Sequence, residues 1–246
     1  MTDKVKLMFI LGTVVNGLLI IVGTLLGKLL HRIPEKMKGT VMQGIGLAVV
    51  VLGLQMGFKS ANFLIVILSL VFGAVIGEYF DLEDKLNKLG DWIESKVGVG
   101  NGPGNISQGF VTATLIFVIG AMAIIGALDS GIRGDHDVLY TKSIIDGFTA
   151  LILTTTLGIG VIFSAIPVML YEGSIALFAT QIDRLVPQAL MDSFILEMTA
   201  TGGVMIFAIG LNLMGLTKIR VANLLPGILV TALIVTGMYF VQGNLM

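Results

Sequence analysis

Long apolar stretches separated by short polar connections make up most of this chain. A helix needs about 20 predominantly apolar residues to cross the hydrocarbon core of a bilayer. Seven stretches approach or exceed that length, at roughly 8–30, 41–58, 62–77, 110–128, 143–163, 198–216 and 221–241. The pattern predicts an all-α fold, a polytopic transmembrane helix bundle of seven to eight spans.

An eighth apolar stretch, at 162–182, is interrupted by polar and helix-breaking residues. It contains Pro167 near its start and Tyr171-Glu172-Gly173-Ser174 in its middle. Irregular backbone is tolerated at membrane depth only where protein or a water-filled cavity surrounds it. This stretch is therefore expected either to span or to be a broken, re-entrant segment.

The connection at about 80–108 has the character of a soluble segment. Leucines and Ile93 recur at helical spacing with charged residues between them, and Trp92 lies beside the apolar stripe. This predicts an amphipathic helix at the membrane interface or on a neighbouring subunit, followed by a flexible Gly-rich loop at 98–104. The chain is interpreted as a single integral membrane domain covering 1–246.

The distribution of basic residues in the short loops predicts the orientation. The first loop carries Lys28, Arg32, Lys36 and Lys38, and such residues are retained on the cytoplasmic side. The N-terminus is therefore expected outside and the 80–108 segment inside, although two lysines near the N-terminus favour the opposite arrangement.

Composition narrows the functional classes further. Of 246 residues, 55% are hydrophobic and only 13% charged, with a net charge of −1, two His and no Cys. An ordinary soluble domain has about a quarter of its residues charged, so a soluble fold is excluded. The absence of Cys excludes disulfides and thiolate metal sites, and no basic surface for nucleic acid is evident. No cofactor and no metal are expected.

Two helix pairs in the sequence match one another. Aligning Gly46 with Gly203 also aligns Gly53 with Gly210. In the same alignment Gln55 corresponds to Asn212, and after a short turn Asn62 corresponds to Asn223. Weak internal symmetry of this kind is typical of transporter folds. The repeat is inverted if the 162–182 stretch crosses the membrane and parallel if it does not.

The four aligned glycines are also interpreted as helix-packing residues. Small residues allow membrane helices to approach closely, since lipid supplies no hydrophobic force for their association. Contacts of this type serve packing within one subunit or between subunits, and a homo-oligomer is expected for so small a bundle.

Polar side chains at membrane depth are costly and usually face the bundle interior or water. Ten are present within or at the ends of the spans, and all except Gln43 and Glu197 are taken as the candidate permeation or substrate site: Glu172, Asp146, Asp129, Asn212, Gln55, Asn16, Asn62 and Asn223.

Several of these candidates also have a structural interpretation. Asn62, Asp146 and Asn223 open their predicted helices, where such residues cap free backbone N–H groups. Asp146 lies one helical turn from Lys142 and can pair with it. Glu172 is either at membrane depth or in a solvated loop, and Gln55 and Asn212 are expected to meet near a pseudo-symmetry axis.

Several sequence segments carry a resemblance to a known family. They include Gly120-Ala121-Met122-Ala123-Ile124-Ile125-Gly126-Ala127-Leu128, Gly134-Asp135-His136, Ser164-Ala165-Ile166-Pro167 and Glu197-Met198-Thr199-Ala200. Through them nearly the whole chain resembles the YqgA/YdfK-like family of bacterial integral membrane proteins, a domain of unknown function. The resemblance implies a multi-pass protein of the bacterial inner membrane, and it supplies no substrate and no catalytic residue.

Three classes of function remain to be compared. The repeat and the polar residues at depth favour a transporter or channel for an ion or small solute, gradient-driven or passive because no Walker-type loop is present. The glycine-rich spans and the amphipathic segment favour a non-transporting scaffold or assembly factor. An enzyme is not expected, since neither a His-Glu-x-x-His nor a Gly-x-Ser-x-Gly pattern occurs.

Overall fold

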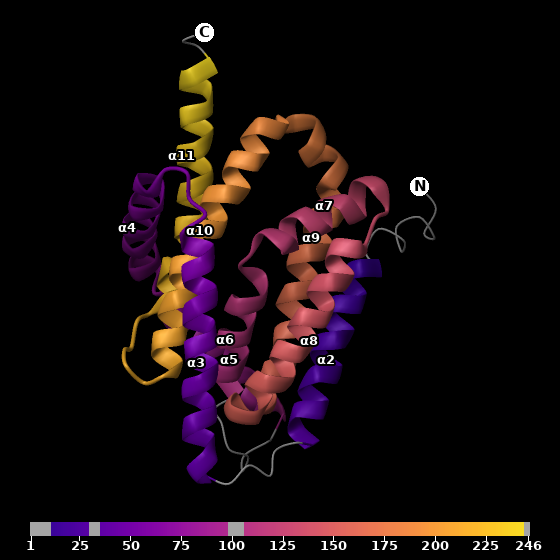
Figure 1. Ribbon diagram of the computed structural model, residues 1–246, viewed down its shortest axis with the longest axis vertical. Helices are drawn as coiled ribbons and strands as arrows, with labels where there is room; N and C mark the ends of the chain where they lie inside the picture. Colours follow the sequence, from indigo (N-terminus) through magenta and orange to yellow (C-terminus); the bar gives the residue numbers. More distant parts are fainter. Residues whose placement is uncertain (1–10, 30–34, 98–105, 244–246) are drawn as a thin grey trace. The chain divides into compact units, whose positions relative to one another are not determined.

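The computed structural model describes residues 11–29, 35–97 and 106–243, and this part of the chain is almost entirely helical. The two N-terminal lysines, Arg32 of the first loop and the Gly-rich 98–104 segment lie outside the described residues. Figure 1 shows the helices in chain order: α2 (Leu11–Leu29), α3 (Glu35–Gly57), α4 (Phe63–Phe80), α5 (Leu82–Val97), α6 (Ile106–Val118), α7 (Ala121–Arg133), α8 (Asp137–Leu157), η1 (Ile159–Ser164), α9 (Ala165–Leu185), α10 (Gln188–Leu213), η2 (Val221–Leu224) and α11 (Pro226–Gly243).

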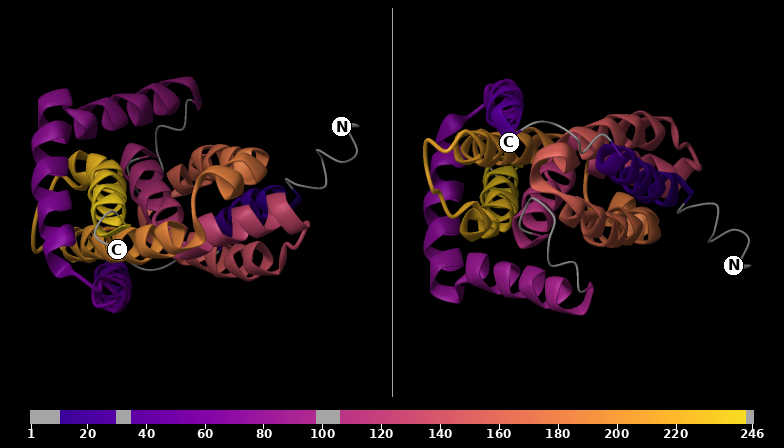
Figure 2. Two further views of the ribbon diagram at one scale, coloured as in Figure 1. Left: turned by 90° about the horizontal axis from the view of Figure 1, so that it is seen from above. Right: turned by 90° about the horizontal axis from the view of Figure 1, so that it is seen from below.

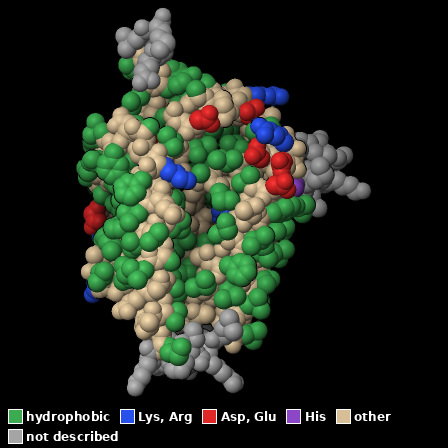
Figure 3. Space-filling model, viewed as in Figure 1, with side chains coloured by type: hydrophobic (Ala, Val, Ile, Leu, Met, Phe, Trp, Pro, Cys, Tyr) green, Lys and Arg blue, Asp and Glu red, His purple; other side chains and the backbone are tan. Residues whose placement is uncertain are grey.

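The described helices confirm a polytopic helical membrane protein. Six segments are long and apolar enough to cross a bilayer, namely α2, α3, α4, η1 with α9, α10 and α11, and a seventh is the pair α6–α7, which is bent by 64°. Many large apolar side chains on them are exposed, and in Figure 3 hydrophobic side chains are spread over the whole face while charged ones are few. Surface of this kind is suited to contact with lipid.

The boundaries of several predicted spans differ from those in the structure. The stretch expected at 198–216 belongs to α10, which begins already at Gln188. The helix expected at 143–163 begins instead at Asp137 and ends at Leu157. Gly158 follows with a φ of +80°, a backbone conformation that favours glycine, and the short helix η1 begins after it. α8 is long enough to span a bilayer, but it is less apolar than the six spanning segments named above because it carries Lys142 and Asp146.

The 162–182 stretch is not broken at Pro167 or Glu172. α9 runs without interruption from Ala165 to Leu185, and Pro167 is accommodated because it lies in the first turn, where a missing N–H costs nothing. Glu172 consequently lies inside a helix. Among the described helices, the bent segment is α6–α7, whose break falls at residues 119–120.

The described helices fall into two compact units. The first, unit 1, contains α2, most of α5, α6, α7, α8, η1 and α9. Here α2 lies along both α8 and α9 (Figures 1 and 2). Positions Gly12 and Gly27 of α2 lie against Leu139 and Leu151 of α8, so these two helices run parallel.

Unit 2 contains most of α3, together with α4, α10, η2 and α11. A Cβ placed on Gly46 would lie 3.0 Å from the carbonyl oxygen of Gly210, and one on Gly53 would lie 2.7 Å from that of Gly203. The converse distances, from Gly210 to Gly46 and from Gly203 to Gly53, are both 2.8 Å. α3 and α10 are therefore antiparallel and touch through their backbones at the four aligned glycines.

The other helix pair in unit 2 is built in the same way. A Cβ on Gly73 of α4 would lie 2.5 Å from the Cα of Gly227 of α11, and one on Gly77 would lie 2.7 Å from the Cα of Asn223. At the other end of the pair, Ile65 and Val235 share a buried apolar cluster with Leu190 of α10. α4 and α11 therefore also run antiparallel.

Candidate functional site

Four polar side chains meet inside unit 1, and we call them the polar cluster: Asn16 of α2, Lys142 and Asp146 of α8, and Glu172 of α9. Asn16 Nδ2 donates hydrogen bonds to Asp146 Oδ2 at 3.1 Å and to Glu172 Oε1 at 2.9 Å. Lys142 Nζ also donates to Asp146 Oδ2 and lies 3.2 Å from Glu172 Oε1. One amide and one ammonium group thus hold the two carboxylates together.

The local sequence explains how three helices bring these side chains together. Lys142 and Asp146 are four positions apart on α8 and therefore share one face of the helix. Three of the four cluster residues are followed directly by glycine, in Asn16-Gly17, Asp146-Gly147 and Glu172-Gly173. A Cβ on Gly17 would collide with Met169, and one on Gly147 would lie 3.0 Å from the carbonyl oxygen of Leu19. Small residues here let the helices approach closely enough for the polar groups to touch.

The polar cluster is buried. The exposed fraction is 0% for Asn16 and Glu172 and 6% for Lys142 and Asp146. A buried charge is costly unless it is paired and hydrogen-bonded. With both carboxylates ionised, the four side chains carry one positive and two negative charges, so one negative charge has no counterpart within the cluster.

Some polar atoms in and beside the polar cluster have no hydrogen-bond partner among the residues that the structure describes. They are Asn16 Oδ1, Glu172 Oε2 and Thr13 Oγ1. Thr13 is one helical turn before Asn16 on α2, is 2% exposed, and lies beside Gly173, since its Cγ2 is 3.7 Å from where a Cβ on Gly173 would be. Unpaired buried polar groups are rare and call for an explanation.

The predicted candidates Glu172, Asp146 and Asn16 are therefore brought together, and the predicted Lys142–Asp146 pair is present. Asp146 does not cap a helix, because α8 begins at Asp137. Lys142 and Thr13 were not among the candidates selected from the sequence. Lys142 could have been recognised as a site residue because it lies four positions before Asp146. Nothing in the sequence distinguishes Thr13 from the many other Thr residues of the spans.

Asp129 lies apart from the polar cluster, near the end of α7. Its carboxylate is 3.5 Å from Arg133, and its side chain is 24% exposed. The next residue, Ser130, has its Oγ 2.8 Å from His136 Nδ1, which lies just before α8. These contacts hold the turn between α7 and α8 and do not extend to Glu172.

Asn62 has the capping role predicted for it. It is the N-cap of α4, and its side chain accepts a hydrogen bond from the backbone N–H of Leu64 at 3.2 Å. Glu197 of α10 accepts from Ser60 Oγ at 2.6 Å, from the N–H of Ala61 at 2.9 Å and from that of Asn62 at 3.0 Å. A carboxylate at the start of a helix is stabilised by the helix dipole, so Glu197 acts here as an anchor for the α3–α4 turn.

Asn223 does not cap α11. It is 2% exposed, its Oδ1 accepts from the N–H of Glu83 at 2.7 Å, and its Nδ2 donates to Glu78. Arg220 pairs with Glu78 and Asp81, and the hydrogen bond to Asp81 is the main reason that the pKa of Arg220 is raised. The backbone of Ala222 donates to Glu83 at 2.8 Å, so this group ties the α4–α5 corner to η2.

Gln55 and Asn212 do not meet. Gln55 is exposed and lies near the Gly53–Gly203 contact, whereas Asn212 follows Gly210, which packs on Gly46. In this antiparallel packing Asn212 lies about 11 residues of α3 away from the level of Gln55, which is about 16 Å along the helix axis. Asn212 instead stabilises the turn after α10, since it accepts from Thr217 Oγ1 at 2.7 Å and from the N–H of Ile219 at 2.9 Å.

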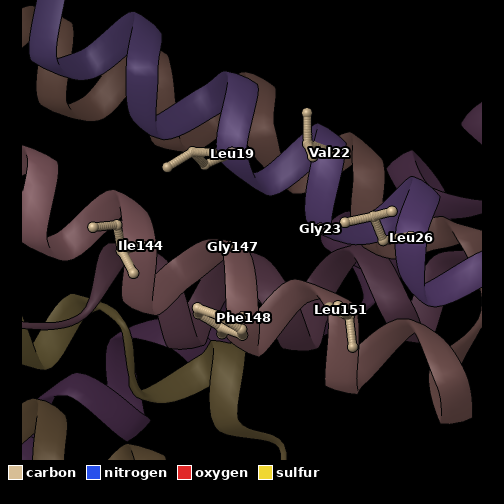
Figure 4. A pocket seen from close by; sticks show the side chains of 8 residues that line it. All are labelled: Leu19, Val22, Gly23, Leu26, Ile144, Gly147, Phe148 and Leu151. Atoms are coloured by element: carbon tan, nitrogen blue, oxygen red, sulfur yellow. The ribbon is translucent and has the colours of Figure 1, made fainter.

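Two apolar pockets lie in unit 1. One of about 190 Å³ lies between α2 and α8 and is shown in Figure 4, with Gly23 and Gly147 where the helices approach and leucines around them. The other, of about 440 Å³, lies between α5 and the helices η1, α6 and α9, with Trp92 and Lys96 on its α5 side. Within the described residues, no group of three or more His, Cys, Asp and Glu is placed to hold a metal ion.

Comparison with known proteins gives a consistent result. Residues 11–236 match the family described as "Protein of unknown function (DUF554)". Over 229 residues the chain is 31% identical to the "Uncharacterized membrane protein YdfK" of Bacillus subtilis (strain 168), covering 91% of this chain and 95% of that protein. Over 224 residues it is 31% identical to the "Uncharacterized protein YqgA" of Escherichia coli (strain K12), covering 89% and 94%. No solved structure matches the chain.

Proposed function

This chain belongs to the DUF554 family, and we propose that it is a membrane transporter or channel for an ion or small solute, with the polar cluster of unit 1 in its pathway. The observation that carries the proposal is the burial of two carboxylates and one ammonium group among apolar helices. Ionisable groups at membrane depth are rare, and they characteristically mark ion pathways and proton relays.

A purely structural role explains this cluster less well. Replacing a buried ion pair with apolar residues of similar volume is often neutral or stabilising, so packing alone does not require Lys142, Asp146 and Glu172. The leftover negative charge and the unpaired acceptor atoms add further cost. A site that binds a charged or polar solute gains from both features.

The helix directions in unit 2 support the same proposal. α3 packs antiparallel on α10, and α4 on α11, which is the arrangement that two helix pairs related by an inverted repeat would adopt. Inverted repeats are common in secondary transporters. The absence of a Walker loop in the sequence favours gradient-driven or passive movement, and the setting we propose is the bacterial inner membrane, with the N-terminus outside.

The alternative is a non-transporting scaffold or assembly factor, and α5 is the observation in its favour. This helix is amphipathic, and its Leu89 and Trp92 are 45% and 58% exposed. An apolar stripe of this kind can lie on the bilayer or on another subunit of a homo-oligomer. The scaffold function needs the glycine contacts and α5, and it does not need the charges of the polar cluster.

Flux into liposomes by the purified protein distinguishes the two functions. Na⁺, K⁺, H⁺ and Cl⁻ are tested in turn with the wild-type chain, Glu172→Gln and Asp146→Asn, and with Glu94→Gln of α5 as the matched control. Transport through the polar cluster predicts flux that is lost in the first two variants and kept in the control, with all proteins equally monodisperse. Unchanged flux in both cluster variants would remove the cluster from the pathway.

A further inference from the structure

The charge balance of the polar cluster points to the ligand it takes. One ammonium faces two carboxylates, so one more positive charge makes the cluster neutral. Groups on the other elements packed against α9 do not provide it. Within the described residues, α6 and η1 carry no charged side chain, and Lys28 is at the far end of α2. Asp129 and Arg133 of α7 pair with each other. Lys96 of α5 lines the apolar pocket between α5 and α9.

The unpaired atoms show where that charge is missing. Glu172 Oε1 receives donors from Asn16 and Lys142, but Glu172 Oε2 receives none from any described residue. Asn16 Oδ1, on a side chain that already contacts Glu172, is an acceptor without a donor. Thr13 is not hydrogen-bonded to Asp146 or Glu172 in the described structure. Its hydroxyl is likewise buried and unpaired, and its side chain lies beside Gly173. All three are oxygen atoms that can accept a hydrogen bond.

We infer that the polar cluster binds a proton on Glu172 Oε2, and that this proton is the transported or coupling ion. The inference rests on the proposed function and deepens it. A proton on this atom converts an unpaired acceptor into a donor, and Asn16 Oδ1, on a side chain that already contacts Glu172, is an unpaired acceptor. It also brings the four side chains to zero net charge, since Glu172 becomes neutral while Lys142 remains paired with Asp146.

A proton fits these observations better than a metal ion. Ca²⁺ and Mg²⁺ need about six or more oxygen ligands, and the described residues offer no group of three or more His, Cys, Asp or Glu side chains for a metal ion. The Lys142 ammonium lies within 3.2 Å of Glu172 and would repel a metal cation placed there. A proton needs one acceptor and one neighbouring oxygen, which are the atoms the polar cluster leaves free.

Lys142 gives the cluster a means of responding to the proton. Its Nζ contacts both Asp146 and Glu172, so it compensates both carboxylates when the proton has left. When the proton binds, the attraction between Lys142 and Glu172 weakens and Asp146 becomes the principal partner. The contact that weakens links α8 to α9, so proton binding is coupled to the packing of these two helices.

The test is infrared difference spectroscopy of the purified full-length protein, titrated with pH, combined with proton flux in liposomes. We expect the carbonyl band of a protonated, buried carboxylic acid that disappears in Glu172→Gln and persists in Glu94→Gln. In Asp146→Asn, where Lys142 alone balances the charge of Glu172, the band should appear only at lower pH. We also expect at least a tenfold loss of proton-driven flux in Glu172→Gln. Glu172→Asp keeps a carboxylic acid at the same position, so its shifted band tests the assignment even if Glu172→Gln does not fold.

The outcomes separate this inference from the proposed function. Flux of an ion that is independent of the pH gradient, without a titrating band from Glu172, would overturn the proton assignment and leave transport standing. A titrating band from Glu172 without flux of any tested ion, H⁺ included, would leave proton binding standing and overturn the proton as the transported ion, together with ion transport as the proposed function.

Discussion

Lys142 Nζ lies 3.2 Å from Glu172 Oε1, and this ion pair joins α8 to α9 at a point where both side chains are buried. The same ammonium also contacts Asp146 on its own helix. Among the described residues, Lys142 is thus the one cation that pairs with these two buried carboxylates.

Replacement of Lys142 by Met is expected to destabilise the protein by about 3–5 kcal/mol, because removing one partner of a buried ion pair leaves uncompensated charge behind. Thermal unfolding in detergent measures the effect, with the exposed Lys59→Met as control. The double variant Lys142→Met with Glu172→Gln should recover part of the stability, since its cluster has the same formal charge as the wild type. Equal melting of Lys142→Met and Lys59→Met would contradict this account.

Replacement of Gly53 by Val should separate α3 from α10. A Cβ at this position would lie 2.7 Å from the carbonyl oxygen of Gly203 and also collide with Phe207, and overpacking costs about 1–3 kcal/mol or more. Nothing lies within 4 Å of a Cβ on Gly44 of the same helix, so Gly44→Val is the matched control. The prediction fails if both variants unfold at the same temperature.

Glu197→Gln is expected to weaken the start of α4 without abolishing its hydrogen bonds. The amide oxygen can still accept from Ala61 and Asn62, but the interaction of a charge with the helix N-terminus is lost, at a cost of about 0.3–2 kcal/mol. Hydrogen exchange of the amides at residues 61–66 should become faster, and transport should be kept. Protection equal to that of the wild type would show that the charge of Glu197 contributes nothing to the turn.

The corner between α4 and α5 should depend on Asn223 more than on Arg220. Asn223→Ala removes a buried partner of the Glu83 N–H and of Glu78, and leaving such groups unsatisfied costs about 1–3 kcal/mol. Arg220 is exposed, so its contacts with Glu78 and Asp81 are screened by salt. Arg220→Ala should therefore have a smaller effect that shrinks further at high ionic strength, and the reverse ranking in thermal unfolding would refute this assignment.

Trp92 provides a direct test of whether α5 lies on the membrane. It is the single Trp of the chain and is 58% exposed, so all Trp fluorescence reports on this helix. At the interface we expect strong quenching by lipids brominated near the headgroup and weaker quenching by those brominated at the chain end. Trp92→Phe supplies the background. Quenching by aqueous iodide alone would instead place α5 in water.

The helical and membrane-spanning character of the fold could be predicted from the sequence because it depends on apolar length alone. The eight stretches all correspond to helices, including the bent pair α6–α7. The position of the break could not be predicted, since Pro167 resembles a helix breaker but falls in a first turn, where proline is tolerated. The sequence contains no comparably clear signal at residues 119–120.

The site was predictable in part for a related reason. Glu172, Asp146 and Asn16 attract notice because polar side chains are expensive in apolar helices, and the structure brings them together. Asn62, Asn212, Asn223 and Asp129 share that property but lie near helix ends, where backbone groups and turns use them locally. Distinguishing the two groups requires knowing where the helices end, which composition defines to only a few residues.

The relative directions of the packed helices constrain how the chain threads the bilayer. If every long segment crosses once, with α6–α7 counted as one crossing and α8 included, then α8 must run in the same direction as α2, and α10 and α11 must oppose α3 and α4. The glycine contacts show these three relations. An even number of passes follows, so reporter enzymes fused before α2 and after α11 should report the same compartment, with α5 and the 214–220 turn together in the other.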